Sequence, residues 1–243
     1  MADQTCIQIR PNILMLADTN ERGFTSYCTL IRGSEMAILI DTGFGNLDLR
    51  SFLDSHVTTP YMVVNTHSHP DHVGGNHQFD TVWSVEEELT AVAKYPDNPP
   101  ITYIQRPLTF GQCISLGDLH VDVVSLGGHT NGCTGFLIRE ERLLIAGDGF
   151  GPGVWLFGPY ALPIKAFRQT LLRALELEFD TFLYSHSTEE FPKERILSHL
   201  EHLDNITVDP ATMRPHRDME TYRSVYRGPH GKSVIVFTLD KLE

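Results

Sequence analysis

Short apolar runs separated by polar or glycine turns occupy the first part of the chain. Runs at 13–16, 26–31 and 36–40 have the length and composition of β-strands, and residues 32–34 provide a turn between the last two. A compact apolar run at 61–65 has the character of a buried strand. The pattern predicts an N-terminal strand meander followed by a further strand.

Between and after these runs, the apolar positions change to a helical period. Residues 47–56 are predicted to form a helix, and a second helix is expected to begin at Ser84, which fits a capping box with Glu87. One face of this second helix is apolar and is formed by Val85, Leu89 and Val92.

The second half of the chain alternates strands with helices. Strands are predicted at 119–126, 134–139, 143–146, 181–184 and 232–239. One helix is predicted to start at Pro163 and another to cover 191–203, with the inward residues Ile164, Phe167, Leu171, Leu175, Ile196, Leu200 and Leu203. Such alternation requires helices to cover sheet faces, and both a two-sheet sandwich and a doubly wound single sheet satisfy that requirement.

Length and charge narrow the class of protein. With 243 residues the chain is expected to form a single domain over 1–243, with a short C-terminal extension (205–243) packed on it. The net charge is −12 and we find no run of Lys and Arg, so no nucleic-acid partner is expected. The acidic triplet Glu86-Glu87-Glu88 is interpreted as a solvated helix start.

The cysteines and the apolar runs indicate the cellular compartment in which the protein is expected. The four cysteines are widely spaced without a Cys-x-x-Cys pair, which argues against a disulfide framework, and Cys133 is interpreted as a small buried residue in preference to a reactive thiol. The N-terminus lacks the pattern of a signal peptide, and no apolar stretch approaches the ~18–20 residues of a membrane span. We therefore expect a cytoplasmic protein with reduced thiols and no membrane association.

The candidate chemistry is concentrated immediately after the run at 61–65. Within six residues lie three imidazoles and one carboxylate, His67, His69, Asp71 and His72, and two glycines follow them. A strand end followed by a tight loop can point several side chains into one small volume, and these side chains are ligands that zinc, iron and manganese accept. A metal site is favoured over the alternative, a histidine-rich surface loop.

Three further predicted strands run into residues that can bind a metal. His129 lies in a Gly-His-Thr sequence, Asp148 follows Ala-Gly, and His186 follows Tyr-Ser. Each alone is a weak indication, because a His after a strand is more often a hydrogen-bonded loop residue. Together with the first cluster they give seven candidate ligands at the ends of four strands.

These motifs resemble those of the metallo-β-lactamase superfamily. The resemblance runs from about Asp41 to His186 and includes Asp41-Thr42-Gly43, the His-x-His-x-Asp-His cluster and Gly-His-Thr, in the same order. It implies an α/β fold of the αββα type, a four-layer sandwich of two mixed β-sheets with outer helices and with metals at one edge. The choice of the sandwich over the single sheet comes from this resemblance and not from the periodicity.

The resemblance also implies a role for each candidate ligand. One metal ion would be bound by His67, His69 and His129, a second by Asp71, His72 and His186, and both by the bridging Asp148. The expected cofactors are two Zn²⁺ per chain, with iron or manganese as alternatives. A hydroxide shared by the ions would attack a substrate carbonyl, and Asp71 and Asp148 are the candidate catalytic residues because they would orient it and hold both ions.

Further residues are candidates for supporting roles. Asp41 is expected to hold a ligand imidazole by its other ring nitrogen, although a turn and helix-start Asp is an equal alternative. Residues 150–165 are expected to form a loop that shapes a pocket. In that loop Trp155, Phe157 and Tyr160 are candidates to line the substrate pocket, with loop packing or a dimer contact as alternatives.

The substrate is less determined than the site, because members that resemble this chain catalyse many reactions on one fold. Asp148 stands where the commonest β-lactamases have Cys, and His69 stands where flavodiiron proteins have Glu, which disfavours both activities. The residues after His186 make glutathione thioester specificity doubtful. A small-molecule ester, lactone or thioester is expected, with a di-iron redox enzyme or a phosphodiesterase-type hydrolase as alternatives and a homodimer left open.

Overall fold

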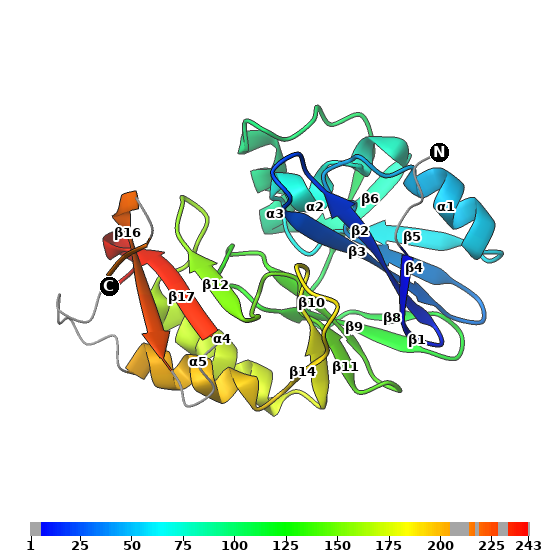
Figure 1. Cartoon of the computed structure of the whole chain (residues 1–243). Helices are drawn as coiled ribbons and strands as arrows, with labels where there is room; N and C mark the ends of the chain where they lie inside the picture. The colour runs from blue at the N-terminus through cyan, green and yellow to red at the C-terminus, as the bar shows by residue number, and fades with distance from the viewer. Residues whose placement is uncertain (1–5, 205–213, 217–218, 228–232, 243) are drawn as a thin grey trace.

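Two large β-sheets pack face to face in the computed structural model, which describes residues 6–204, 214–216, 219–227 and 233–242 (Figure 1). The first sheet contains, in sequence order, β1 (Cys6–Arg10), β2 (Ile13–Thr19), β3 (Thr25–Arg32), β4 (Ala37–Ile40), β5 (Tyr61–Val64), β6 (Thr81–Val85) and β7 (Ile104–Leu108). Strands β1 to β4 are antiparallel, whereas β4 to β7 run parallel. This sheet is therefore mixed.

The second sheet has the strand order β14 (Phe191–Pro192), β13 (Thr181–Leu183), β11 (Leu143–Ile145), β10 (Thr134–Ile138), β9 (His120–Ser125) and β8 (Cys113–Ser115). Strands β11 and β13 pair in parallel and the other neighbours are antiparallel. Strands β9, β11 and β13 consequently point the same way, so their C-terminal ends meet at one edge of the sheet.

The helices are short and lie between or after the strands. They are α1 (Leu49–His56), α2 (Pro70–Val73), α3 (Glu86–Ala91), α4 (Ile164–Glu176) and α5 (Arg195–Asp204), with 3₁₀ turns η1 (Asn76–Gln78), η2 (Val92–Lys94) and η3 (Leu239–Lys241). Figure 1 places α1 to α3 on the side of the first sheet and α4 and α5 on the opposite side of the molecule.

The alternation of side chains along the strands explains the layers. In β2, Ile13 and Met15 belong to the core between the two sheets, whereas Leu14 and Leu16 face outward into the core that α1 closes. All four side chains are buried. Because both faces of the sheets carry apolar side chains, each outer face needs a helix layer, and α4 and α5 provide it for the second sheet. The predicted four-layer sandwich is confirmed.

The structure contains a third, smaller sheet that the sequence did not predict. Its order is β12 (Gly153–Leu156), β17 (Ser233–Thr238), β16 (Met219–Arg227) and β15 (Arg214–His216), and β12 pairs in parallel with β17. The expected loop over 150–165 is therefore partly a strand. Val154 and Phe237 join the core formed with α4 and α5.

The predicted domain organisation stays a prediction. Of the expected C-terminal extension over 205–243, residues 205–213, 217–218, 228–232 and 243 lie outside the described residues.

Two predicted helix starts are wrong. Ser84 lies in β6, where its hydroxyl donates to the Asn65 carbonyl at 3.4 Å, and α3 begins after Val85 without a side-chain cap. The capping box does not form because the run at Thr81–Val85 pairs with β7. The helix expected over 191–203 begins at Arg195, because its first residues form β14 beside β13.

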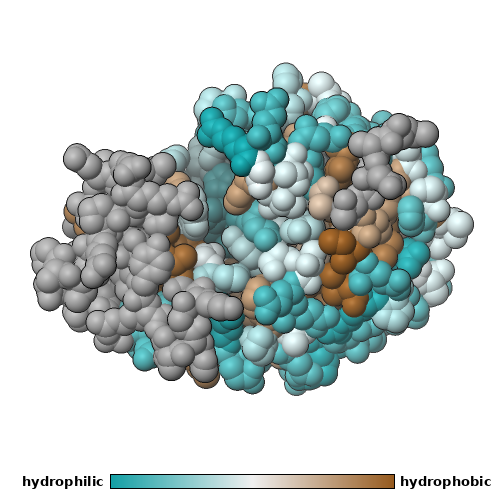
Figure 2. All heavy atoms as spheres, in the orientation of Figure 1, coloured by the Kyte–Doolittle hydropathy of each residue, from teal (hydrophilic) through white to brown (hydrophobic). Residues whose placement is uncertain are grey.

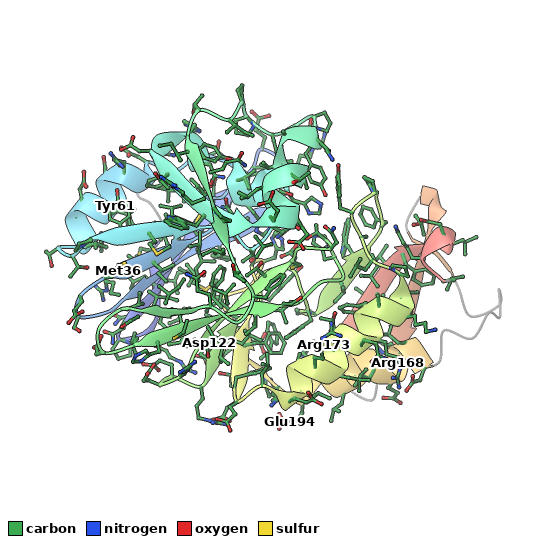
Figure 3. The ribbon with its side chains drawn as sticks, turned by 180° about the vertical axis from the view of Figure 1, so that it is seen from behind. Met36, Tyr61, Asp122, Arg168, Arg173 and Glu194 are labelled. Carbon is green, nitrogen blue, oxygen red and sulfur yellow. The ribbon has the colours of Figure 1, made fainter. Side chains whose placement is uncertain are left out.

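The face seen in Figure 2 is largely hydrophilic, with apolar residues in scattered patches. Seen from behind, α4 carries Arg168 and Arg173, and β9 carries Asp122 (Figure 3). A cleft of about 380 Å³ lies between β9 and α4, and none of the seven candidate ligands lines it. Among the described helices, none has the length and apolar character needed to cross a membrane.

Candidate metal centre

The fold brings the seven candidate ligands to one edge of the sandwich. The loop after β5 in the first sheet supplies four of them, and the loops after β9, β11 and β13 supply His129, Asp148 and His186. Pro70 begins the single-turn helix α2, with His69 extended before it and with Asp71 and His72 inside it. The alternation of extended and helical backbone turns these neighbouring side chains toward one space.

Three imidazoles form the first group. The His69 Nδ1 atom lies 3.0 Å from His67 Nε2 and 2.8 Å from His129 Nε2. His67 is fully buried and His129 is nearly so. Three ring nitrogens this close to one another match a three-histidine metal site.

Asp71, His72 and His186 form the second group. Asp71 Oδ2 lies 3.5 Å from His72 Nε2 and 3.6 Å from His186 Nε2. One carboxylate with two imidazoles is again a donor set that zinc, iron or manganese accepts.

Asp148 lies between the two groups. Its Oδ2 atom is 3.1 Å from His186 Nε2 and 3.8 Å from His129 Nε2, and its Oδ1 atom is 3.8 Å from His72 Nε2. The Oδ2 atom thus faces one histidine of each group, whereas the Oδ1 atom faces the second group, and the bridging role stays a prediction.

Two polar atoms show that the donor set fits a cation. His72 Nε2 and Asp148 Oδ1 are both buried, and neither has a hydrogen-bond partner among the described residues. Burial of a polar atom without a partner is costly, and a metal ion between these atoms would satisfy both. The donor set fits divalent metal ions, although the individual ligand roles stay predictions.

The outer ring nitrogens of three of these histidines are fixed by acceptors. The Nδ1 atom of His72 donates to Asp41 Oδ2 at 2.8 Å, that of His129 to the Trp155 carbonyl at 2.7 Å, and that of His186 to the Thr25 carbonyl at 2.7 Å. A proton on Nδ1 leaves the Nε2 lone pair free to face the centre.

Asp41 occupies the supporting position proposed from the sequence. It is buried, has a φ of 62°, and also accepts from the Thr66 backbone N–H and hydroxyl, each at 2.8 Å. Positive φ is tolerated by Asp better than by most residues. One carboxylate therefore holds His72 and fixes the start of the ligand loop.

Sequence reasoning missed Glu88. It was interpreted as part of a solvated helix start, but only 2% of it is exposed. Its carboxylate accepts from the backbone and hydroxyl of Ser68 and from Thr130 and Gly132, which belong to two ligand loops. The helical period contained an indication, because Glu88 lies three residues after Val85 and four before Val92, on the apolar face.

Two imidazoles of the first group and two of the second have pKa values shifted in opposite directions in the metal-free protein. Burial lowers the pKa of His67 well below its ordinary value and the pKa of His69 to about 3, and neighbouring imidazoles add to the effect. Burial also acts to lower the pKa of His72 and His186, but nearby carboxylates outweigh it and raise both.

The carboxylates respond to these imidazoles. Burial acts to raise the pKa of Asp71, but His72 outweighs it and the pKa falls to about 2. For Asp148, His186 and His72 likewise outweigh burial and lower the pKa well below its ordinary value. Both carboxylates are therefore charged and available to a cation near neutral pH.

The three candidate pocket residues separate into two places. Tyr160 packs against Tyr95, with ring centroids 5.4 Å apart, and Tyr95 packs against His69 at 4.8 Å. Trp155 lies on β12, is 38% exposed and contacts Phe157 at 5.3 Å. Its carbonyl holds His129, a role the sequence did not indicate.

Phe24 is an aromatic residue beside the second group that the sequence analysis did not identify. It is 48% exposed and lies 4.6 Å from the His186 ring. Cys133, in contrast, is fully buried, and burial raises the pKa of its thiol well above the ordinary value. A small buried residue, as predicted, describes it better than a reactive thiol.

Sequence comparison now identifies the family. A profile described as "Metallo-beta-lactamase superfamily" matches residues 22–224. This chain belongs to the metallo-β-lactamase superfamily. The acyl-coenzyme A thioesterases MBLAC2 of Bos taurus and Homo sapiens are each 28% identical to it over 197 residues, covering 65% of this chain and 70% of the relative. The hydroxyacylglutathione hydrolase of Erythrobacter litoralis is 32% identical over 123 residues, covering 49% of this chain and 45% of the relative.

Solved structures of this superfamily share the fold. A metallo-beta-lactamase from Pontibacter korlensis aligns with a TM-score of 0.67 at 19% identity, covering 84% of this chain and 100% of that chain. One from Erythrobacter litoralis aligns with a TM-score of 0.64 at 16% identity, covering 84% and 97%. The predicted family and fold are confirmed, and the curated relatives support the prediction of a hydrolase.

Proposed function

We propose that this protein is a dinuclear metal-dependent hydrolase of small thioesters. The observation that carries the proposal is the convergence of two groups of ligands on Asp148, with His72 Nε2 and Asp148 Oδ1 buried and unpartnered among the described residues. Two such groups joined by a carboxylate match a two-metal hydrolase site.

We favour thioesters over the other substrates expected from the sequence because of the activities that the names of the relatives state. MBLAC2 is an acyl-coenzyme A thioesterase, and the Erythrobacter protein is a hydroxyacylglutathione hydrolase. A third relative, from Cryptosporiopsis, is an atrochrysone carboxyl ACP thioesterase with 26% identity over 149 residues. These names specify different leaving groups. The feature that they share is cleavage of an acyl–sulfur bond.

Two bound divalent ions supply Lewis acidity and a water whose pKa is lowered to about 7. We propose two Zn²⁺ per chain, with iron or manganese as alternatives, because the donors are imidazole nitrogens and carboxylate oxygens. Asp148 would hold both ions, and Asp71 would bind one of them and orient the attacking water. The carbonyls of Trp155 and Thr25 keep the His129 and His186 rings aimed at the centre.

A substrate panel on protein of measured metal content tests the proposal. Acyl-coenzyme A, hydroxyacylglutathione, oxoester, lactone and phosphodiester substrates are assayed with zinc, iron and manganese. We expect thioesters to have the highest kcat/KM with zinc and no oxygen consumption with iron. Turnover of phosphodiesters alone, or oxygen consumption, would contradict the proposal.

Two ligand variants and one control complete this test. We expect Asp148→Ala and His69→Ala to lower the metal content and reduce kcat by at least about 10³-fold, because each removes a ligand. His120→Ala, at a half-exposed histidine paired with Glu140, should retain full activity. Full activity in either ligand variant would contradict the assignment.

A further inference from the structure

We propose that Glu88 is a positioning residue that aligns the three-imidazole group, His67, His69 and His129, for the first metal ion. The inference rests on the proposed function, because it requires that a metal ion binds there. No hydrogen bond joins Glu88 to these rings. It acts on the backbone and hydroxyl groups next to them.

The contacts of Glu88 join two loops that are far apart in sequence. Its Oε2 atom accepts from the Ser68 backbone N–H at 2.9 Å and from the Ser68 hydroxyl at 2.5 Å. Its Oε1 atom accepts from the Thr130 hydroxyl at 2.6 Å and from the Gly132 backbone N–H at 3.1 Å. Each carboxylate oxygen therefore holds one loop.

Burial makes these contacts hard to replace. Glu88 is 2% exposed, and among the described residues no cation forms an ion pair with it. A buried carboxylate needs several donors, and Glu88 obtains four from the two loops. The loops cannot separate without leaving this carboxylate unsatisfied.

The positions of the donors assign Glu88 to the first group. Ser68 lies between His67 and His69, and Thr130 follows His129 directly. The distance of 2.8 Å between His69 Nδ1 and His129 Nε2 depends on the separation of these two loops, because each loop supplies one of the two rings. The second group has its own supports, since Asp41 holds His72 and the Thr25 carbonyl holds His186.

The variant Glu88→Gln tests this role. A glutamine has one carbonyl oxygen, so its NH₂ group must face either Ser68 or Gly132, and a backbone N–H cannot rotate to accept from it. One loop is thereby released at little change in volume. The matched control is Glu86→Gln, at an exposed residue of the same acidic triplet.

Both variants and the wild-type protein are titrated with Zn²⁺ from the metal-free state. The NMR signals of the histidine rings distinguish Zn²⁺ binding at the first group from Zn²⁺ binding at His72 and His186. A competing chelator gives the Zn²⁺ affinity of each site. For Glu88→Gln we expect the first group to bind Zn²⁺ about 10- to 100-fold more weakly, with the affinity at His72 and His186 unchanged. Glu86→Gln should match the wild type.

Several outcomes would overturn the inference. Equal loss at both groups, together with a lower midpoint of urea unfolding, would show a general structural role. Wild-type affinity at the first group would show no role. If Glu88→Gln does not fold, Thr130→Val removes one donor and should weaken the first group severalfold, and wild-type affinity in that variant would also reject the inference. A wild-type protein that binds no metal would instead reject the proposed function.

Discussion

The two halves of the candidate metal centre are supported in different ways. On one side, Asp41 accepts directly from the His72 ring and also from Thr66, the residue before His67. On the other side, Glu88 forms no hydrogen bond to a ring and joins two loops through Ser68 and Thr130. One carboxylate orients a ligand, whereas the other sets the distance between ligands.

The difference extends to charge. Carboxylates surround His72 and raise its pKa, whereas imidazoles surround His69, whose pKa falls to about 3 through burial and these neighbours. His67 and His69 therefore offer a cation neutral lone pairs, whereas the second half offers negative charge. Substitutions in the two halves should therefore change the stability of the metal-free protein, and its dependence on pH, in different ways.

The largest effect on stability is expected for Asp41→Ala. It removes the acceptor of three buried donors and places Ala at a φ of 62°, which is strained for that residue. We expect the free energy of unfolding of the metal-free protein to fall by about 3–4 kcal/mol, as measured by urea denaturation.

Asp41→Asn is the control for that change. It tolerates positive φ and keeps one oxygen for the Thr66 N–H, so about half of the loss should be recovered. An unchanged unfolding midpoint for Asp41→Ala would show that Asp41 is not a support of the second half.

An intermediate effect is expected from acid. The unfolded chain protonates His69 below about pH 6.5, whereas the folded protein does so only near its pKa of about 3. Stability is therefore lost as the pH falls from 6.5 toward 3. Metal-free His69→Asn should lose on the order of 2 kcal/mol less than wild type between pH 7 and pH 5.

His72 should behave in the opposite way. Its folded pKa is raised, so its contribution is fully present below about pH 6.5 and is lost as the pH rises through the folded value. Metal-free His72→Asn should therefore lose more stability at pH 5 than at pH 8, relative to wild type. The same pH slope in both variants would remove the electrostatic distinction between the halves.

The smallest effect is expected from the aromatic rings that lie against each half. Phe24 is 48% exposed and packs on His186. Phe24→Ala should weaken zinc binding in the second half by about threefold and leave the first unchanged, because a ring contact contributes less than a hydrogen-bonded carboxylate. Tyr95→Ala should weaken zinc binding in the first half, through its contact with His69, and leave the second half unchanged. Site-resolved zinc titration measures both, and weakening at both sites in one variant would contradict the separation.

The sequence predicted most of the fold and the cluster itself. Apolar runs of strand length located β2, β3, β4 and β5 within a few residues, and helical periodicity located α1, α4 and the core of α5. The candidate ligands were found because metal-binding residue types follow strands, and the resemblance then selected the sandwich. Local pattern was sufficient where one residue type carries a specific chemistry.

What the sequence did not predict depends on distant pairing. Strand β12 forms because residues 153–156 meet β17, about eighty residues later in the chain, and no local pattern announces that partner. Glu88 was assigned to solvent because its acidic neighbours dominated the interpretation, although its helical position pointed inward. The donors that satisfy it come from two other loops, which only the tertiary fold brings together.

The pairing of β12 with β17 also bears on the order of events during synthesis. A ribosome releases the loop after β5 and His129 well before Ser233–Thr238, and β17 is the described neighbour of β12. Until that last strand emerges, the Trp155 carbonyl that aims His129 belongs to an unpaired segment. We therefore expect this contact to His129 to form only after residues 233–238 have been synthesised.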